Sequence, residues 1–235
     1  MKTFLLDYVE IKIYKSTLAR KITISIRPHR GVRITIPRYA SFLEAERFAI
    51  HKREWIATNL KKVNEFVNQS ERNPVSGFVT KNHQLMLEPK ATSGVKVRVQ
   101  KGTILVKYNS ELTQDSKEVR VAVKKGILLA LKKEAVEYLP NRLSELAKKN
   151  GLLYNNIAIK NMKSRWGSCT GRNNINLTIH LMRLPDHLID YILLHELAHT
   201  IVKNHSKKYW VTLENICPNS KQMDKELKSH RIMAL

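Results

Sequence analysis

The residues best suited to chemistry lie in one short stretch, YILLHELAHTIVKNH, which runs from Tyr191 to His205. His195, Glu196 and His199 form a His-Glu-x-x-His pattern within it. Each residue of an α-helix turns by about 100°, so the two histidines would lie about 40° apart on one face, where both can bind a single metal ion. Zinc is the expected ion, because it accepts neutral imidazole in a tetrahedral site. Glu196 would lie beside the pair, placed to reach a water molecule at the metal rather than the metal itself.

The residues around this pattern are mostly apolar, and no proline interrupts it. They are Ile192, Leu193, Leu194, Leu197, Ala198, Ile201 and Val202. Such flanks predict a buried helix that carries a polar site. The alternative is a buried helix whose histidines only form hydrogen bonds with their neighbours.

His205 offers a third imidazole six residues after His199. Six helical steps rotate by about 240°, so a continuous helix would direct this side chain away from the metal. We therefore expect the helix to end before His205, with a turn at Asn204 in the left-handed conformation. Ser206 would then cap a further helix that begins near Lys207. The alternative for His205 is a surface histidine in a polar loop.

The composition indicates a globular chain without a membrane span. The 235 residues are 43% hydrophobic and 26% charged, and no apolar run approaches the ~20 residues that cross a bilayer. The N-terminus, MKTFLLDYVE, lacks the apolar region of a secretory signal, which predicts a cytoplasmic location. Cys169 and Cys217 fit free thiols in a reducing compartment, although either remains an alternative metal ligand.

The net charge is +22, with 42 Lys and Arg against 20 Asp and Glu spread along the whole chain. A surface of this kind attracts polyanions, of which nucleic acid is the obvious candidate. The alternative is a solvated basic surface without such a partner. Charge is the only sign of this partner, because the aromatic residues form no evident stacking platform.

The N-terminal half alternates between strand and helix patterns. Residues 21–26 (KITISI) and 32–36 (VRITI) alternate in polarity around a turn at 27–31, which predicts a β-hairpin. Ser41 and Glu44 form a capping box that opens a helix to about residue 66. Three short strands follow, near residues 84–87, 95–99 and 104–108. A hairpin followed by a helix thus occurs twice in the sequence.

The C-terminal half contains the His-Glu-x-x-His helix. A long helix is expected over residues 114–149, kinked or split by Pro140. A strand is expected over residues 157–162, and another over 175–179 (INLTI) is expected at a sheet edge, where it would pair with an extended substrate. Pro185 and Asp186 would open the metal helix. These patterns divide the chain into a region of β-hairpins and helix, residues 1–112, and a catalytic domain, residues 113–235.

Three segments carry a resemblance to a known family: RWGSC at 165–169, HELAH at 195–199 and NHSKKYW at 204–210. Together they resemble the YgjP-like metallopeptidases, relatives of the SprT-like and WLM zinc proteases within the zincin superfamily. The resemblance implies an α+β, zincin-like fold. In this fold a mixed sheet packs on helices, one of which is the metal helix, and a β-hairpin-rich N-terminal region precedes them. It implies that His195, His199 and His205 bind zinc and that Glu196 is the catalytic base. It does not identify a substrate, although SprT-like relatives cleave proteins crosslinked to DNA.

The predicted function is zinc-dependent hydrolysis of peptide bonds in a protein or peptide substrate, with nucleic-acid-associated proteins as one class of target. Three histidines leave one coordination position for water, as catalytic zinc requires. The alternatives are a basic nucleic-acid-binding protein with structural zinc and a zinc hydrolase of non-peptide amides. Arg165, His180 and Tyr209 are candidates to contact the substrate or stabilise the oxyanion. Their alternative roles are an ion pair, a polar strand residue and packing, respectively.

Overall fold

In the computed structural model, placement is described for residues 1–27, 30–71, 77–91, 93–230 and 232, with only the backbone for residues 66–71. The chain forms two compact units, Met1–Arg72 and Asn73–Leu235. The sequence prediction placed the division after residue 112 instead. The difference arises because the strands between residues 84 and 109 pack on the long helix that follows them. In the described part of the chain, no helix has the length and apolar character needed to cross a membrane.

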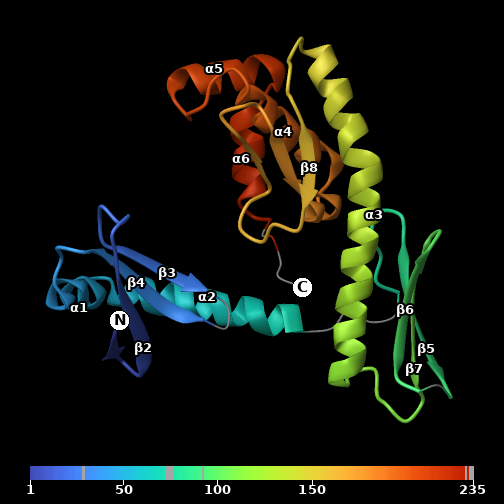
Figure 1. The fold of residues 1–235 in the computed structure, drawn as a ribbon, viewed down its shortest axis with the longest axis horizontal. Helices are drawn as coiled ribbons and strands as arrows, with labels where there is room; N and C mark the ends of the chain where they lie inside the picture. The colour runs from blue at the N-terminus through green and yellow to red at the C-terminus, as the bar shows by residue number, and fades with distance from the viewer. Residues whose placement is uncertain (28–29, 72–76, 92, 231, 233–235) are drawn as a thin grey trace. The chain divides into compact units, whose positions relative to one another are not determined.

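The first unit is a mixed sheet with helices on one face, drawn in blue to cyan in Figure 1. Its elements are β1 (Lys2–Leu6), β2 (Val9–Ser16), β3 (Thr23–Arg27), β4 (Gly31–Pro37), α1 (Phe42–His51) and α2 (Arg53–Glu71). The strand order is β1-β2-β4-β3. β2 and β4 are parallel, while β1 with β2 and β3 with β4 are antiparallel. Residues 28 and 29 of the predicted turn lie outside the described residues.

Alternation along the strands creates the core of this unit. Ile11 and Ile13 of β2 and Ile34 and Ile36 of β4 are fully buried in one cluster with residues of α1 and α2. The polar residues between them therefore face away from the helices. The capping box predicted at Ser41 is present. The single helix expected to run to residue 66 is instead two helices that meet at Lys52.

The second unit contains two further mixed sheets and the remaining helices. Its strands are β5 (Gln84–Lys90), β6 (Val95–Gln100), β7 (Thr103–Asn109), β8 (Ile157–Lys160), β9 (Gly167–Cys169) and β10 (Ile175–Thr178). Its helices are α3 (Lys117–Lys149), the 3-10 helix η1 (Ile179–Arg183), α4 (Asp186–Ala198), α5 (Lys207–Ile216) and α6 (Ser220–Leu227). The sheets have the orders β5-β7-β6 and β8-β10-β9. In each, the last strand in sequence is central, parallel to the first and antiparallel to the second. In the first unit, β4 lies in the same way between β2, to which it is parallel, and β3, to which it is antiparallel.

The long helix α3 joins these two sheets into one core, with β5–β7 on one side and β8–β10 with α4 on the other (Figure 1). Its 33 residues span about 50 Å. Gly126 permits the close approach of the β5–β7 sheet to α3, because a Cβ at this position would lie 2.6 Å from the Ile104 side chain of β7. Pro140, expected to kink or split the helix, lies inside a continuous helix. The α+β class predicted from sequence is confirmed.

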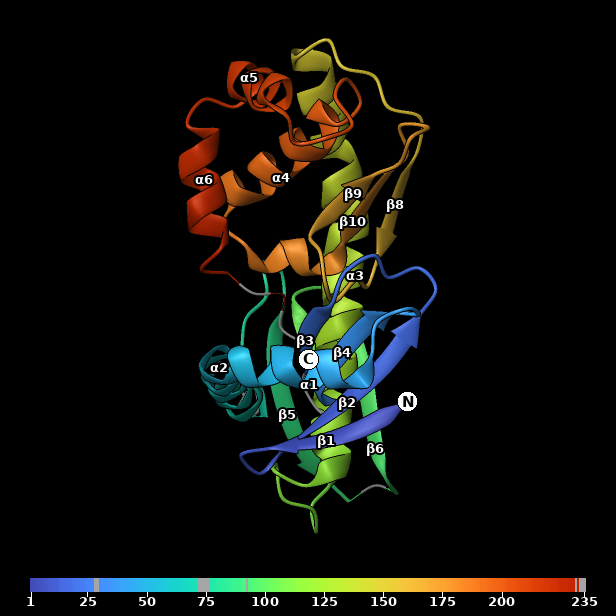
Figure 2. The same ribbon diagram turned by 90° about the vertical axis from the view of Figure 1, so that its left-hand side faces the viewer.

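The prediction that residues 175–179 form a sheet edge is wrong. Their strand, β10, is central, because β8 pairs with one side of it and β9 with the other. The edges of this sheet are therefore β8 and β9. Of these two, β9 contacts the helix that carries the His-Glu-x-x-His pattern, and Figure 2 shows it beside α4.

Candidate metal centre

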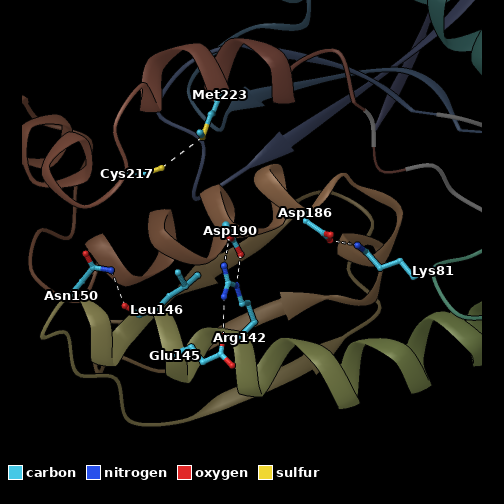
Figure 3. A network of polar contacts seen from close by, with 9 residues as sticks. All are labelled: Lys81, Arg142, Glu145, Leu146, Asn150, Asp186, Asp190, Cys217 and Met223. Carbon is cyan, nitrogen blue, oxygen red and sulfur yellow. Dashed lines mark hydrogen bonds and ion pairs between the residues drawn. The ribbon is translucent and has the colours of Figure 1, made fainter.

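Helix α4 is held against α3 by charged side chains (Figure 3). Arg142 of α3 donates from Nε to Asp190 Oδ1 at 2.8 Å and from Nη2 to Asp190 Oδ2 at 2.6 Å. This paired geometry is the strong form of an arginine–carboxylate contact. At the start of α4, Asp186 forms an ion pair with Lys81. With most of its side chains buried as well, α4 is a rigid support for the histidines near its end.

The three histidines converge on one point. Their ligand atoms lie within 4.8 Å of one another. His205 Nε2 lies 3.2 Å from His199 Nε2 and 3.3 Å from His195 Nε2. Two nitrogens bound to one tetrahedral zinc at 2.0–2.1 Å would be separated by about 3.4 Å. The donor set and its spacing therefore fit a zinc ion.

The end of α4 brings His205 back to the other two. His199 is the C-terminal cap, and the chain then turns through hydrogen bonds from Ile201 N and Val202 N to the Ala198 carbonyl. The helix thus ends before His205, as expected from the 240° rotation. The left-handed turn expected at Asn204 is not present; its side-chain oxygen accepts from Ser206 N–H at 3.3 Å instead. Ser206 is the N-cap of α5, without a side-chain hydrogen bond.

The protonation of the histidines suits metal binding. His199 Nδ1 donates to the Val202 carbonyl at 3.0 Å, because a carbonyl can only accept, and this leaves the Nε2 lone pair directed at the other imidazoles. Burial, with smaller effects of His199 and His205, lowers the pKa of His195 to about 4. Burial also lowers the pKa of His199. Neutral imidazole is the form that binds a metal.

Glu196 is buried beside this cluster, at 5% exposure. Its Oε2 has no hydrogen-bond partner among the described residues, which is unusual for a buried carboxylate. Burial raises the pKa of Glu196 to about 8, against a lowering effect of the Arg165 charge. Perturbed carboxyl groups with an unused oxygen are typical of general bases and acids.

Gly167 of β9 lies against Glu196. A Cβ at Gly167 would lie 2.6 Å from Glu196 Oε1, 2.8 Å from Cγ and 2.9 Å from Cδ, so any larger residue would displace the carboxylate. The sequence analysis did not identify this role. The signal lay in the RWGSC segment, where a glycine inside a strand marks a close approach by another group.

Tyr209 of α5 packs against the rings of all three histidines. Its ring stacks on His199 with centroids 4.5 Å apart and meets His205 edge-on at 4.8 Å. Its hydroxyl donates to the His195 carbonyl at 3.2 Å, and burial raises its pKa. The side chain is fully buried. In this structure the Tyr209 ring packs on the histidines, and its hydroxyl is engaged by the His195 carbonyl.

The other two candidates lie in different surroundings. Arg165 is exposed two residues before β9 and acts electrostatically on Glu196. His180 is buried in η1, where its Nε2 lies 2.9 Å from Asn161 Oδ1. Among the described residues, the convergent cluster consists of the three histidines. His180, Cys169 and Cys217 are not part of it. The structure thus brings Arg165 towards the site and leaves His180 outside it.

Comparison with known proteins identifies a family for this chain. The YgjP-like metallopeptidase domain model matches residues 20–230. The crystal structure of the metallopeptidase zymogen abylysin of Pyrococcus abyssi is 23% identical, with a TM-score of 0.35, over 40% of this chain and 98% of that one. The zymogen jannalysin of Methanocaldococcus jannaschii is 27% identical, with a TM-score of 0.34, over 38% of this chain and 91% of that one. A comparison with curated proteins found no match.

Both TM-scores are below 0.5, so the assignment rests on the family model, which covers most of the chain. The family is one of metal-dependent hydrolases that act on proteins or peptides. The chain belongs to the YgjP-like metallopeptidase family.

Proposed function

We propose that this metallopeptidase is a zinc enzyme of zincin-like design, in which His195, His199 and His205 bind the ion and Glu196 is the general base. The observation that carries the proposal is the buried Glu196 carboxylate, with an unused oxygen, next to three converging imidazoles. Among the residues that the structure describes, Oε2 of this carboxylate has no hydrogen-bond partner that would explain its burial. A role in proton transfer does explain it.

The proposed chemistry divides between the ion and the chain. Zinc held by the three histidines would supply a Lewis acid and would make a water molecule acidic enough to react near neutral pH. Glu196 takes the proton from the attacking water and later gives it to the leaving amide nitrogen. Tyr209 and the Val202 carbonyl keep the imidazoles oriented throughout.

We further propose that the substrate lies along the free edge of β9. This strand pairs only with β10 among the described residues, so its other side is available to an extended peptide. Gly167 places that edge directly beside Glu196. Arg165, two residues earlier and exposed, is the best of the three candidates for contacting the substrate or the oxyanion. Tyr209 has its hydroxyl engaged, and His180 is buried outside the cluster.

Structural zinc is the competing interpretation, and the donor count argues against it. Structural zinc sites have four protein ligands, whereas the described residues supply three to this cluster.

The test is Glu196→Gln, which retains size and hydrogen bonding but is no longer a base. The variant is expected to fold, to keep its zinc and to lose about 10²–10⁴-fold of its activity on a denatured protein substrate. Glu137→Gln, an exposed change on α3, is the matched control and should leave activity unaltered. An active Glu196→Gln variant would exclude the proposed base, and loss of zinc from it would make Glu196 a structural residue.

A further inference from the structure

A hollow of about 310 Å³ lies on the sheet of the first unit, far in sequence from the metal cluster. We call it the basic hollow, and its lining residues are Lys12, Tyr14, Arg27, Arg30, Gly31 and Arg33. Four of these six residues carry a positive charge, and none is acidic or aliphatic. The proposed peptidase mechanism has no use for them.

Strand alternation and register place these cations together. Lys12 lies between the buried Ile11 and Ile13, so its side chain emerges on the face opposite the helices. Lys12 is the direct register partner of Arg33 on β4. On the other side of β4, Arg27 of β3 is the partner of Gly31. The cluster therefore crosses three adjacent strands, β2, β4 and β3.

The positive charge of the basic hollow is largely uncompensated. Glu10 approaches Lys12 at 4.0 Å, the limit of an ion pair. Within the described part of the chain, Arg27, Arg30 and Arg33 form no ion pair with a carboxylate. Like charges held this close repel one another and attract an anion from solution.

Arg33 is also held in place before any ligand arrives. Its guanidinium lies over the Tyr14 ring, 4.0 Å from the centroid. This cation–π contact limits the freedom of a long side chain, so less entropy is lost when the arginine binds an anion. A guanidinium can donate two parallel hydrogen bonds to phosphate oxygens.

We propose that the basic hollow binds the phosphodiester backbone of nucleic acid. Three adjacent strands span about 10 Å, which is wider than one phosphate group and calls for a ligand with several in a row. The lining offers no aliphatic side chains for an acidic amphipathic peptide. Since Arg33 covers one face of Tyr14 and the other contacts are cationic, binding is independent of base sequence. The proposal does not depend on the metal centre, because the two sites lie in separate units.

The experiment measures binding of the full chain to a fluorescent 20-nucleotide DNA strand by anisotropy, at 50–200 mM salt. Each phosphate contact contributes about 0.7 to the slope of log affinity against log salt concentration, so four cations contribute about 2.8. With this slope, the affinity for DNA falls about 50-fold between 50 and 200 mM salt. In Arg27→Gln/Arg33→Gln the slope is expected to fall by about 1.4. Arg27→Lys/Arg33→Lys should restore it.

The matched control is Lys61→Gln/Lys62→Gln, which removes the same charge from exposed positions on α2 of the same unit. Its slope is expected to equal that of the unaltered protein. Equal losses in the two glutamine variants would refute the basic hollow as a site, as would absence of DNA binding at 50 mM salt. Binding to vesicles containing phosphatidylserine, but not to DNA, would assign the cluster to a lipid surface and overturn the proposal. Peptidase activity on a small peptide should be the same in every variant, because the substitutions all lie in the first unit and the metal centre lies in the second.

Discussion

The contact between Gly167 and Glu196 gives the most direct test of the site geometry. In Gly167→Ala, the new methyl group would lie within 2.6–2.9 Å of three atoms of the Glu196 side chain. Carbon atoms in contact with other heavy atoms are normally about 3.5–4.0 Å away. The carboxylate or β9 must therefore move by about 1 Å. Glu196 has little free space around it, since it is 5% exposed.

The size of the effect follows from this displacement. A misplacement of about 1 Å in a reacting group costs on the order of 10²-fold in rate. Overpacking of a buried contact costs about 1–3 kcal/mol of unfolding free energy. We therefore expect Gly167→Ala to lower kcat/KM about 100-fold while zinc content stays unchanged, because no histidine is touched.

The assay pairs kcat/KM on a quenched peptide with urea unfolding and zinc analysis. Gly171→Ala is the control, because a Cβ at that exposed turn position would meet nothing within 4 Å. Addition of Glu196→Ala removes the atoms that clash with the new methyl group. In that background Gly167→Ala should cost much less stability than it costs alone.

Two results would refute this reasoning. Gly167→Ala with full activity would mean that the Glu196 carboxylate is not held where the chemistry requires it. An equal stability loss with and without the Glu196 side chain would mean that the clash lies elsewhere in β9.

Three further predictions concern metal binding, pH and helix packing. His205→Ala should lower the zinc content of the purified protein sharply, whereas exposed His51→Ala should not; retention of zinc would point to another third ligand such as Cys169. Burial lowers the pKa of His180 from 6.5 to about 4, so on acidification the unfolded chain takes up a proton that the folded chain excludes. The unfolding free energy should fall by on the order of 3 kcal/mol as the pH drops from 6.5 to 4, with no such contribution above 6.5, and His180→Gln should flatten this dependence in urea titrations. Arg142→Lys keeps the charge but loses the paired contact with Asp190, so unfolding free energy should fall by about 1–2 kcal/mol; an unchanged value would mean that this pair does not hold α4.

The sequence alone was informative where the physical cause is local. The spacing of His195 and His199 places both on one helical face whatever surrounds the helix. The same argument required the helix to end before His205, and the structure ends α4 at Ala198. The capping box at Ser41 and the alternating strands of the first unit are equally local, and the structure contains them.

The errors occurred where a feature depends on which segments meet in space. The boundary between the units was misplaced, because β5–β7 look like a continuation of the N-terminal hairpins until their packing on α3 is seen. Alternation in residues 175–179 predicts a strand but says nothing of how many neighbours it has, so the central position of β10 was missed.

The details of the candidate site were likewise decided by tertiary structure. Tyr209 and Arg165 looked like equivalent candidates in the sequence, but packing buries the tyrosine behind the histidines and leaves the arginine exposed near Glu196. Gly167 became a site residue only when β9 was seen against α4. The helical period determines which side chains share a face. Only the packing of distant segments determines which side chains meet at a carboxylate, line one cavity or converge as metal ligands. Those contacts depend on backbone positions that no short stretch of sequence specifies.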